Sequence, residues 1–419
     1  MSPRAAAPRR RRTRAGTLLA LAAALLAAGC GTSHELVGNR ISGRTLTIYT
    51  SLPLQGASGA GGRAVLDGEQ LALSQARGRV GQFGVRLRAL DDATVARGGW
   101  DPGQTTLNVA AARQDASTIA YIGDFNSGAS AIAIPPLNRL GILTISPTST
   151  AVGLTTDGPS ASPGEPAKYY PTGQRTFVRL SPDDGQQASA QLRLQRALHC
   201  TRTYLLDDGD FDGYAAANAF QLAARAAGRP VIGLQSFQPQ ARDYTSLALA
   251  VAQLAPDCVL ISALPESHAA LLATQLAAHL PQAKLFLTAP LAQPSVTNPD
   301  RGGVPLSLDS RVFITAPAGD PVSARAFDRA FTQRYGAPGP YAVYGYEAMR
   351  LVLAAIARAT GGGHDDARRS AVLGAALHRA VPTSALGPFT VHADGTTSLR
   401  SYGVFTLQNG VPVLWYELS

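Results

Sequence analysis

Residues 118–146 read TIAYIGDFNSGASAIAIPPLNRLGILTIS, and they decide the class of fold. A short apolar run at 118–125 is followed by a helical stretch at 130–141 and by a second apolar run at 142–146. Two short strands joined by a helix are typical of a βαβ unit, in which the strands lie parallel. The stretch therefore predicts a parallel sheet covered by helices, with a break in the helix near Pro135 and Pro136.

The same alternation continues on both sides of this unit. The first series is completed by expected strands at 45–51 and 85–92 and by expected helices at 67–75 and 105–115. The second series has expected strands at 203–208, 231–237, 258–263 and 284–289, with helices at 214–227, 243–254 and 266–280. Two such series predict an α/β protein with two Rossmann-like lobes, each built on a parallel sheet.

Other segments connect or extend these series. Residues 153–174 are rich in Gly, Pro, Ser and Thr and predict a long surface loop. The glycine-rich run 59–62 predicts a flexible loop between a strand and a helix, with a phosphate cradle as the weaker alternative. Further along, the pattern predicts a strand at 312–317, helices at 321–335, 341–360 and 365–380, and a hairpin turn at Asn409–Gly410.

The first thirty residues have the pattern of an export signal. Arginines crowd residues 4–14, and TLLALAAALLAA at 17–28 is too short an apolar run to span a bilayer comfortably. The small residues before Cys30 resemble the lipobox of bacterial lipoproteins, in which this cysteine would be lipidated; an ordinary cleaved signal is the alternative. We expect a signal peptide at 1–29, a polar tether at 30–44, and a protein anchored by lipid to the outer face of the cytoplasmic membrane.

Charge and motifs exclude several classes of function. The net charge is +9, but six arginines in residues 1–29 account for most of it, so the remaining +3 does not favour a nucleic-acid partner. Neither a nucleophile elbow, nor a P-loop, nor a zinc-protease helix is present. His364–Asp366 is interpreted as a helix start, and Asp207–Asp210 as a loop at a strand end. We therefore expect a binding protein that is not an enzyme, with no metal and no cofactor.

Polar residues follow two adjacent strands of the first series. The strand at 118–125 leads into Asn126 and Ser127, and the next strand leads into Thr148, Ser149 and Thr150. Ligands of open α/β sheets bind at the carboxyl ends of the strands, where hydroxyls and free backbone N–H groups suit a carboxylate. Simple capping of helices by the same residues is the alternative.

With these pieces in place, the chain resembles the branched-chain amino-acid (leucine/isoleucine/valine) binding family, the substrate-binding proteins of ABC importers. The resemblance covers nearly all of residues 45–410. It rests on the order and spacing of SLPLQG (51–56), DGEQLAL (67–73), LDDATVARGGWDPGQT (90–105), IGDFNSGAS (122–130), LGILTISPTST (140–150), DDGDFDG (207–213), RDYTSLALAVAQLAPDCVL (242–260), YAVYGYEAMRLVLAAI (341–356) and LGPFTVHADG (386–395).

The resemblance implies the periplasmic-binding-protein type I fold, two lobes joined by three crossing segments around a ligand cleft that closes. The crossings are expected near Phe177–Leu180, Val312–Pro317 and Thr383–Leu386. One lobe would comprise 45–176 and 318–382, and the other 177–317 and 383–419.

The resemblance also implies a ligand site. Ser127 and Thr148–Thr150 match the positions that hold a ligand's carboxylate, and Asp183 and Phe211 match positions in the cleft wall of the second lobe. The sequence departs from the family at Pro290, where an acid normally binds the ligand's ammonium, at Leu264, where a tyrosine is usual, and at 59–62, where an aromatic lid is missing. Asp183 or Asp210 is expected to supply the missing negative charge if the ligand is a cation.

Cys200 and Cys258 are the two cysteines that remain if Cys30 is lipidated. An even number of cysteines in an oxidising compartment favours a disulfide, and the order 2-1-3-4-5 of doubly wound sheets makes the strands that follow Cys200 and begin at Cys258 neighbours. We therefore expect a disulfide between them, with two buried unpaired thiols as the alternative.

The functional expectation is a solute-binding protein that delivers a small polar, amino-acid-like ligand to the permease and ATPase subunits of an ABC importer. The alternative is a sensor subunit of the same fold that signals to a membrane receptor.

Overall fold

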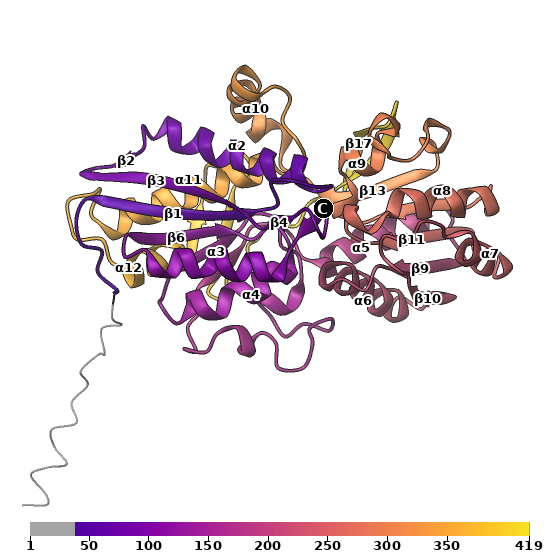
Figure 1. The fold of residues 1–419 in the computed structure, drawn as a ribbon, viewed down its shortest axis with the longest axis horizontal. Coiled ribbons are helices and arrows are strands. Elements are labelled where there is room, and N and C mark those ends of the chain that lie inside the picture. The colour runs from indigo at the N-terminus through magenta and orange to yellow at the C-terminus, as the bar shows by residue number, and fades with distance from the viewer. Residues whose placement is uncertain (1–37, 419) are drawn as a thin grey trace, which may run out of the picture. The chain divides into compact units, whose positions relative to one another are not determined.

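The computed structural model describes residues 38–418. The predicted signal peptide, Cys30 and the first part of the tether lie outside the described residues. The rest forms two lobes, each a β-sheet with helices on both faces (Figure 1). Among the described helices, none combines the length and the apolar character needed to cross a membrane.

The first lobe contains a six-stranded sheet. In the order in which they pair, its strands are β2 (Arg79–Val80), β3 (Phe83–Asp91), β1 (Thr45–Leu52), β6 (Thr118–Gly123), β7 (Leu143–Ser146) and β8 (Phe177–Arg179). One face packs against α2 (Gly59–Gln75), α10 (Pro321–Tyr335), α11 (Ala342–Ala359) and α12 (Arg369–Ala376), and the other against α3 (Pro102–Gln114) and α4 (Ser127–Asn138). Because side chains alternate along a strand, Ile48 lies in one core and Tyr49 in the other.

The second lobe contains a seven-stranded sheet. Its strands pair in the order β10 (Gly233–Ser236), β9 (Thr203–Asp207), β11 (Cys258–Ser262), β12 (Lys284–Leu287), β13 (Val312–Pro317), β16 (Tyr402–Gln408) and β17 (Val411–Leu418). One face packs against α5 (Asp184–Ala197) and α6 (Phe211–Ala226), and the other against α7 (Thr245–Gln253), α8 (Ala269–His279) and the short α9 (Pro294–Thr297). Small hairpins pair β4 (Ala93–Thr94) with β5 (Gly99–Trp100), and β14 (Arg379–Val381) with β15 (Phe389–Val391).

The strand order confirms the predicted fold class. Both sheets contain the predicted neighbours in the order 2-1-3-4 of the sequence series, and the strand at 312–317 and the helix at 321–335 have the predicted bounds. Asn409 and Gly410 both have positive φ angles, 53° and 72°, as the turn of a two-residue hairpin requires.

The glycine-rich run 59–62 is wrong as a predicted loop, because it forms the first turn of α2. A Cβ on Gly62 would overlap the carbonyl of Pro53, and one on Gly61 would overlap the side chain of Gln293. These glycines therefore permit close packing instead of flexibility. Because α2 begins at Gly59, Asp67 lies within the helix and not in its first turn.

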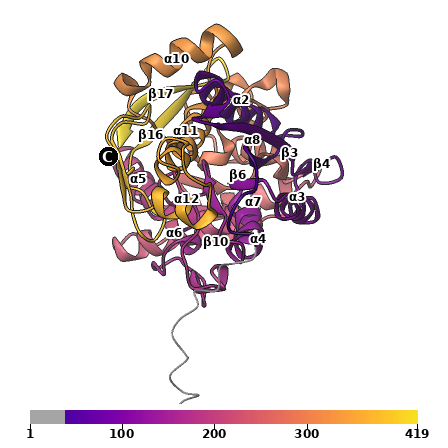
Figure 2. The ribbon, with the colours of Figure 1, turned by 90° about the vertical axis from the view of Figure 1, so that its left-hand side faces the viewer.

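Segments far apart in sequence are packed through glycine in the first lobe. Helices α2 and α11 lie side by side, with Gly68 of α2 against the carbonyl of Ala342 and Gly345 of α11 against the carbonyl of Val65 (Figure 2). Any side chain at either glycine would overlap the opposite backbone. This contact packs α11, from the C-terminal third of the chain, against α2, from the N-terminal part of the described residues.

Three helical predictions need correction. Helix α12 begins at Arg369 and not at 365, because Asp366 pairs with Arg40 at 3.0 Å outside the helix. Helix α4 begins at Ser127 and continues through Pro135 and Pro136 to Asn138 without the predicted break. The third predicted helix of the second series, 266–280, corresponds to α8, which begins at Ala269 after a short 3₁₀ turn.

Helix α5 was not predicted from the sequence. Its signal is a capping box: the Asp183 carboxylate accepts from Gln186 N, and the Gln186 side chain accepts from Asp183 N, each at 3.0 Å. The connection 153–174 also differs from a simple surface loop, because Leu154, Tyr169 and Tyr170 are buried beside Ile134 of α4.

The chain passes between the lobes after β8, after β13 and before β16. Strand β8 pairs with β7 in the first sheet, and Phe389 and Val391 of β15 lie in the first core, whereas the sequence placed residues from 177 and from 383 in the second lobe. The first crossing therefore follows β8, and the third lies between Val391 and Tyr402.

A disulfide joins Cys200, just before β9, to Cys258, the first residue of β11, with Cα atoms 5.8 Å apart. Strands β9 and β11 are parallel neighbours, with Thr203 opposite Cys258. The bridge lies at the amino ends of these strands, away from the loops that form the candidate site.

Candidate functional site

Two loops at the carboxyl ends of β6 and β7 meet at the start of α4. Because α4 begins almost directly after β6, the backbone N–H groups of Ser127 and Gly128 lie in its first turn and have no partner within the helix. The Ser127 hydroxyl oxygen accepts from the backbone N–H of Thr150 at 3.1 Å and of Ala151 at 3.2 Å. The structure thus brings together Ser127 and Thr150, the two residues at the centre of the predicted site.

A carboxylate from the second lobe lies on the start of α4. The Asp212 side chain, in the first turn of α6, accepts from Ser127 N at 2.7 Å and from Gly128 N at 3.2 Å. Burial raises the pKa of Asp212 to about 8, and the negative charge of Asp210 adds to the rise, while the two N–H donors oppose it. The predicted carboxylate position is therefore suited to a carboxylate, and here the carboxylate belongs to the protein.

The remaining predicted residues of the first lobe face different ways. Thr148 donates its hydroxyl to the carbonyl of Phe125 at 2.6 Å, and the hydroxyls of Ser149 and Ser130 share a hydrogen bond at 2.9 Å. Both side chains are therefore used inside the lobe. Asn126 is the N-cap of α4 but makes no side-chain cap, and its buried Oδ1 has no hydrogen-bond partner.

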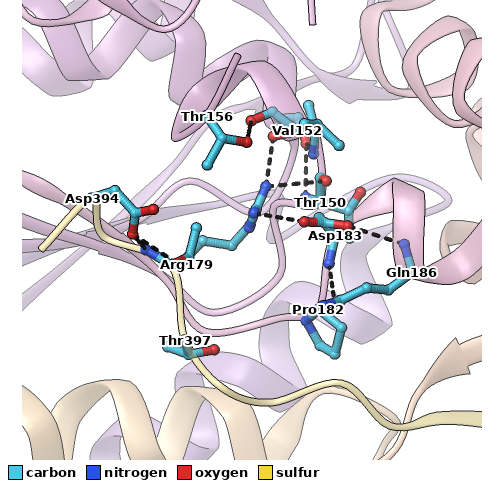
Figure 3. A network of polar contacts seen from close by, with 12 residues as sticks. Thr150, Val152, Thr156, Arg179, Pro182, Asp183, Gln186, Asp394 and Thr397 are labelled. Atoms are coloured by element: carbon cyan, nitrogen blue, oxygen red, sulfur yellow. Dashed lines mark hydrogen bonds and ion pairs between the residues drawn. The ribbon is translucent and has the colours of Figure 1, made fainter. Parts of the chain in front are cut away.

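Asp183 forms an ion pair that ties the site to the first crossing (Figure 3). Its Oδ2 lies 3.1 Å from Nη2 of Arg179, whose side chain is 2% exposed. Arg179 also donates through Nη1 to the carbonyl of Ala151 at 2.8 Å and to that of Thr150 at 3.4 Å. Because Asp183 both caps α5 and pairs with Arg179, its charge is already compensated.

The next residue, Asp184, lies near Arg179, whose charge lowers its pKa, but it makes no ion pair within the described residues. It is 1% exposed, and neither of its carboxylate oxygens has a hydrogen-bond partner. Its backbone N–H donates to the carbonyl of Thr150 at 2.9 Å, which fixes it beside the predicted site. Burial raises the pKa of Asp184 to about 7, although the nearby Thr150 hydroxyl acts in the opposite direction.

More acids line a cavity of about 380 Å³ between the lobes. Asp208, Asp210 and Glu266 come from the second lobe, and Arg97 comes from the loop between β4 and β5 of the first. Burial raises the pKa of Asp208 to about 6 and that of Glu266 to about 7. Arg97 lies 3.9 Å from Asp210 and is about half exposed, so it compensates this group of acids only weakly.

Direct hydrogen bonds also join the lobes around this cavity. Ser58 donates to Glu266 at 3.0 Å, and Ser295 donates to the carbonyl of Ala57 at 2.8 Å. A second cavity, of about 520 Å³, lies beside these contacts and is lined from both lobes. The structure is therefore one in which the two lobes are in contact across the cleft.

Aromatic side chains complete the wall near α4. Phe211 approaches Gly128 so closely that a Cβ on Gly128 would lie 3.1 Å from that of Phe211 and 2.8 Å from the ring of Trp100. Phe211 thus lies against the start of α4. Tyr341 packs edge-to-face on Phe125 with ring centroids 5.5 Å apart, and both rings belong to the core of the first lobe.

Sequence reasoning missed Asp184, Asp212 and Glu266. Asp212 stands in DDGDFDG (207–213), a segment of the family resemblance in which no role was predicted for Asp212, and Asp184 adjoins the predicted Asp183. Only the three-dimensional approach of α6 to α4 shows which of these acids is buried in the cleft. The single grouping of potential metal ligands in the described part of the chain, Cys200, Asp257 and Cys258, has both of its sulfurs in the disulfide.

Comparison with known proteins identifies the family to which the chain belongs. The periplasmic binding protein family matches residues 45–410. A leucine-binding protein (LivK) of Thermotoga maritima has a similar structure, with a TM-score of 0.72 at 20% identity, covering 89% of this chain and 98% of that one. No curated protein sequence matches the chain.

Two further structures show the range of ligands in similar folds. A solute-binding protein of R. palustris in complex with benzoate has a TM-score of 0.69 at 19% identity, covering 89% of this chain and 96% of that one. The isoleucine complex of LivJ from Streptococcus pneumoniae has a TM-score of 0.69 at 15% identity, covering 89% and 98%. The chain belongs to the periplasmic binding protein family and has the type I fold of two α/β lobes.

Proposed function

We propose that the protein captures a small polar solute, an amino acid or a related compound, between its two lobes and delivers it to the permease and ATPase subunits of an ABC importer. The observation that carries this proposal is the meeting of Ser127, Thr150 and the start of α4 with a carboxylate from the opposite lobe. Such a site binds solute when the lobes close on it, and its release follows from hinge opening.

The proposal includes export and anchoring. The signal-like residues 1–29 and Cys30 support a lipoprotein held at the outer face of the cytoplasmic membrane. Replacing Cys30 by Ser should move the protein from the membrane fraction to the soluble fraction. When cells are fed a fatty-acid analogue, the unchanged protein should incorporate it and the Cys30→Ser variant should not. Unchanged fractionation and labelling would contradict lipidation at Cys30.

The central experiment is a ligand screen. The purified protein is heated with amino acids, amides, amines, small aromatic acids and polyols, and its unfolding temperature is recorded. A ligand at a hundred times its Kd adds about 2.7 kcal/mol to the free energy of unfolding. A member of the screen that raises the unfolding temperature supports the proposal, and a Ser127→Ala variant should then lose that response.

A further inference from the structure

We propose that the ligand is an organic cation without a carboxylate, an amine or an amidine, and that Asp212 excludes α-amino acids from the site. This inference rests on the proposed function and narrows its class of ligand. It is carried by three features of the cleft: the occupied start of α4, the unpartnered acceptors beside it, and the shortage of basic side chains around it.

The start of α4 offers N–H donors to which a ligand's carboxylate could bind. Asp212 takes both of them, at 2.7 Å from Ser127 N and 3.2 Å from Gly128 N. The remaining donors are also used, because Thr150 N and Ala151 N bond to the Ser127 hydroxyl. An incoming carboxylate would have to displace Asp212 from both donors, so it is rejected by shape, and by charge repulsion once Asp212 is ionised.

The groups left over at this end of the cleft are acceptors. Both oxygens of Asp184 and Oδ1 of Asn126 are buried without a hydrogen-bond partner. Asp212 uses two of the roughly four acceptor positions of a carboxylate. An ammonium has three donors and no acceptor, and an amidinium is likewise a donor only, so both match what these side chains lack.

A chain of hydrogen bonds links Asp184 to Asp212. Asp184 N bonds to the carbonyl of Thr150, Thr150 N bonds to Ser127, and Ser127 N bonds to Asp212. The negative charge of Asp184 also contributes to the raised pKa of Asp212. A cation seated between the two carboxylates would relieve both the repulsion and the cost of burying unpaired charge.

The wider cleft has the same imbalance. Asp208, Asp210 and Glu266 line the cavity between the lobes, and the charges of Asp184 and Asp210 act on the buried Asp212. Of these five acids, Asp210 alone has a basic side chain within ion-pair distance in the part of the chain that the structure describes. The five are Asp184, Asp208, Asp210, Asp212 and Glu266. The guanidinium carbon of that basic side chain, Arg97, lies 5.8 Å from the ring centroid of Trp100, so the ring also helps to hold this one compensating charge.

The test uses pairs of probes that differ only by a carboxylate: agmatine against L-arginine, cadaverine against L-lysine, and phenethylamine against L-phenylalanine. Binding to the purified protein is measured by calorimetry. We expect at least one amine to bind at least tenfold more tightly than its matched amino acid. Asp184→Asn should lower the affinity for that amine at least tenfold. Asp300→Asn, on an exposed turn of the second lobe, should leave this affinity unchanged.

The variant Asp212→Ala tests exclusion directly. It empties the start of α4, so the matched amino acid should gain at least tenfold in affinity while the amine loses affinity. If the alanine variant does not fold, Asp212→Asn is the second variant, because it keeps the shape of the side chain. It should lower the affinity for the amine, and it should raise the affinity for the amino acid less than Asp212→Ala does.

The outcomes separate this inference from the proposed function. If the unchanged protein bound an amino acid, an aromatic acid or a neutral solute more tightly than the amines, the inference of a cationic ligand would be overturned. The proposed solute-binding function would remain in place. No binding by any amine, amino acid, aromatic acid or polyol would overturn both.

Discussion

Arg179 Nη2 and Asp183 Oδ2 lie 3.1 Å apart and join the crossing strand β8 to the start of α5. The same guanidinium donates to the carbonyls of Thr150 and Ala151, which belong to the loop that faces the predicted ligand (Figure 3). One buried arginine therefore connects the ligand loop of the first lobe, the crossing and the first helix of the second lobe. This arrangement makes Arg179 a positioning residue for the cleft.

Replacing Arg179 by Met should reduce the free energy of unfolding by about 2–4 kcal/mol, because it leaves the Asp183 charge without its ion-pair partner and removes one donor from each of two carbonyls. This loss in stability is smaller than that expected for a fully buried ion pair, because Asp183 is 22% exposed. Urea unfolding measures it. Arg113→Met, at an exposed position in α3, should change the stability by less than about 0.5 kcal/mol, and equal losses in the two variants would contradict the role of Arg179.

Ser127→Ala should reduce stability by about 1–3 kcal/mol even without ligand, because the N–H groups of Thr150 and Ala151 lose their common acceptor. Affinity for an identified ligand should fall by about 1.5–3 kcal/mol if the hydroxyl or its loop touches a charged group of the ligand. Ser189→Ala, on the exposed face of α5, is the matched control. Unchanged affinity in Ser127→Ala would remove this residue from the site.

The contact between α2 and α11 gives a prediction about glycine. Gly68→Ala should destabilise the protein by about 1–3 kcal/mol, because its methyl group would overlap the carbonyl of Ala342. Gly374→Ala, in the exposed face of α12 where a Cβ meets nothing, should instead stabilise by up to about 1 kcal/mol. Thermal unfolding of the two variants should shift in opposite directions, and a shared direction would contradict the packing argument.

The fold could be predicted from the sequence because its strands are short apolar runs separated by helices of sufficient length. The alternation at 118–146 and 203–289 is enough to predict parallel sheets, and the bounds of β13 and α10 follow from apolar runs and turn residues. The prediction at 59–62 was wrong because glycine is typical both of flexible loops and of helices that pack closely against another backbone. Only the position of Pro53 in the structure shows that these glycines serve close packing.

The site was predictable only in part. Ser127 and Thr150 follow adjacent strands, so the rule that ligands bind at carboxyl ends of parallel strands locates them. The acids of the second lobe are different, because Asp183, Asp184, Asp210 and Asp212 look equivalent in the sequence. Their roles depend on which one finds Arg179 and which one reaches α4 across the cleft, and that contact joins residues 85 positions apart.

The disulfide should contribute about 2–4 kcal/mol to stability, chiefly by restricting the unfolded chain between Cys200 and Cys258. The double variant Cys200→Ala/Cys258→Ala should unfold at a lower temperature than the unchanged protein, and reducing agent should lower the unfolding temperature of the unchanged protein alone. Thiol titration of the denatured, non-reduced protein should find no reactive thiol from this pair. Two reactive thiols would show that the bridge is not formed in solution.

The buried acids predict how stability depends on pH. Burial raises the pKa of Asp184 to about 7 and of Asp212 to about 8, whereas an unfolded aspartate titrates near 4. Between these values the folded protein holds more protons than the unfolded chain, so the free energy of unfolding falls as pH rises through this range. Asp124 and Glu266, whose pKa values burial also raises to about 7, act in the same direction.

The unfolding temperature of the ligand-free protein should therefore fall by several degrees between pH 5 and pH 8. Acids with lowered pKa values, such as Asp257, act below about pH 5 and do not mask this slope. Asp184→Asn removes one ionisation from the cleft and should flatten the slope, while Asp300→Asn should leave it unchanged. A bound cation should raise the unfolding temperature more at pH 8 than at pH 5, because its carboxylate partners are then charged. A slope that rises from pH 5 to pH 8 would mean that these carboxylates are ionised and compensated in the folded protein, and it would remove the electrostatic reason for a cationic ligand.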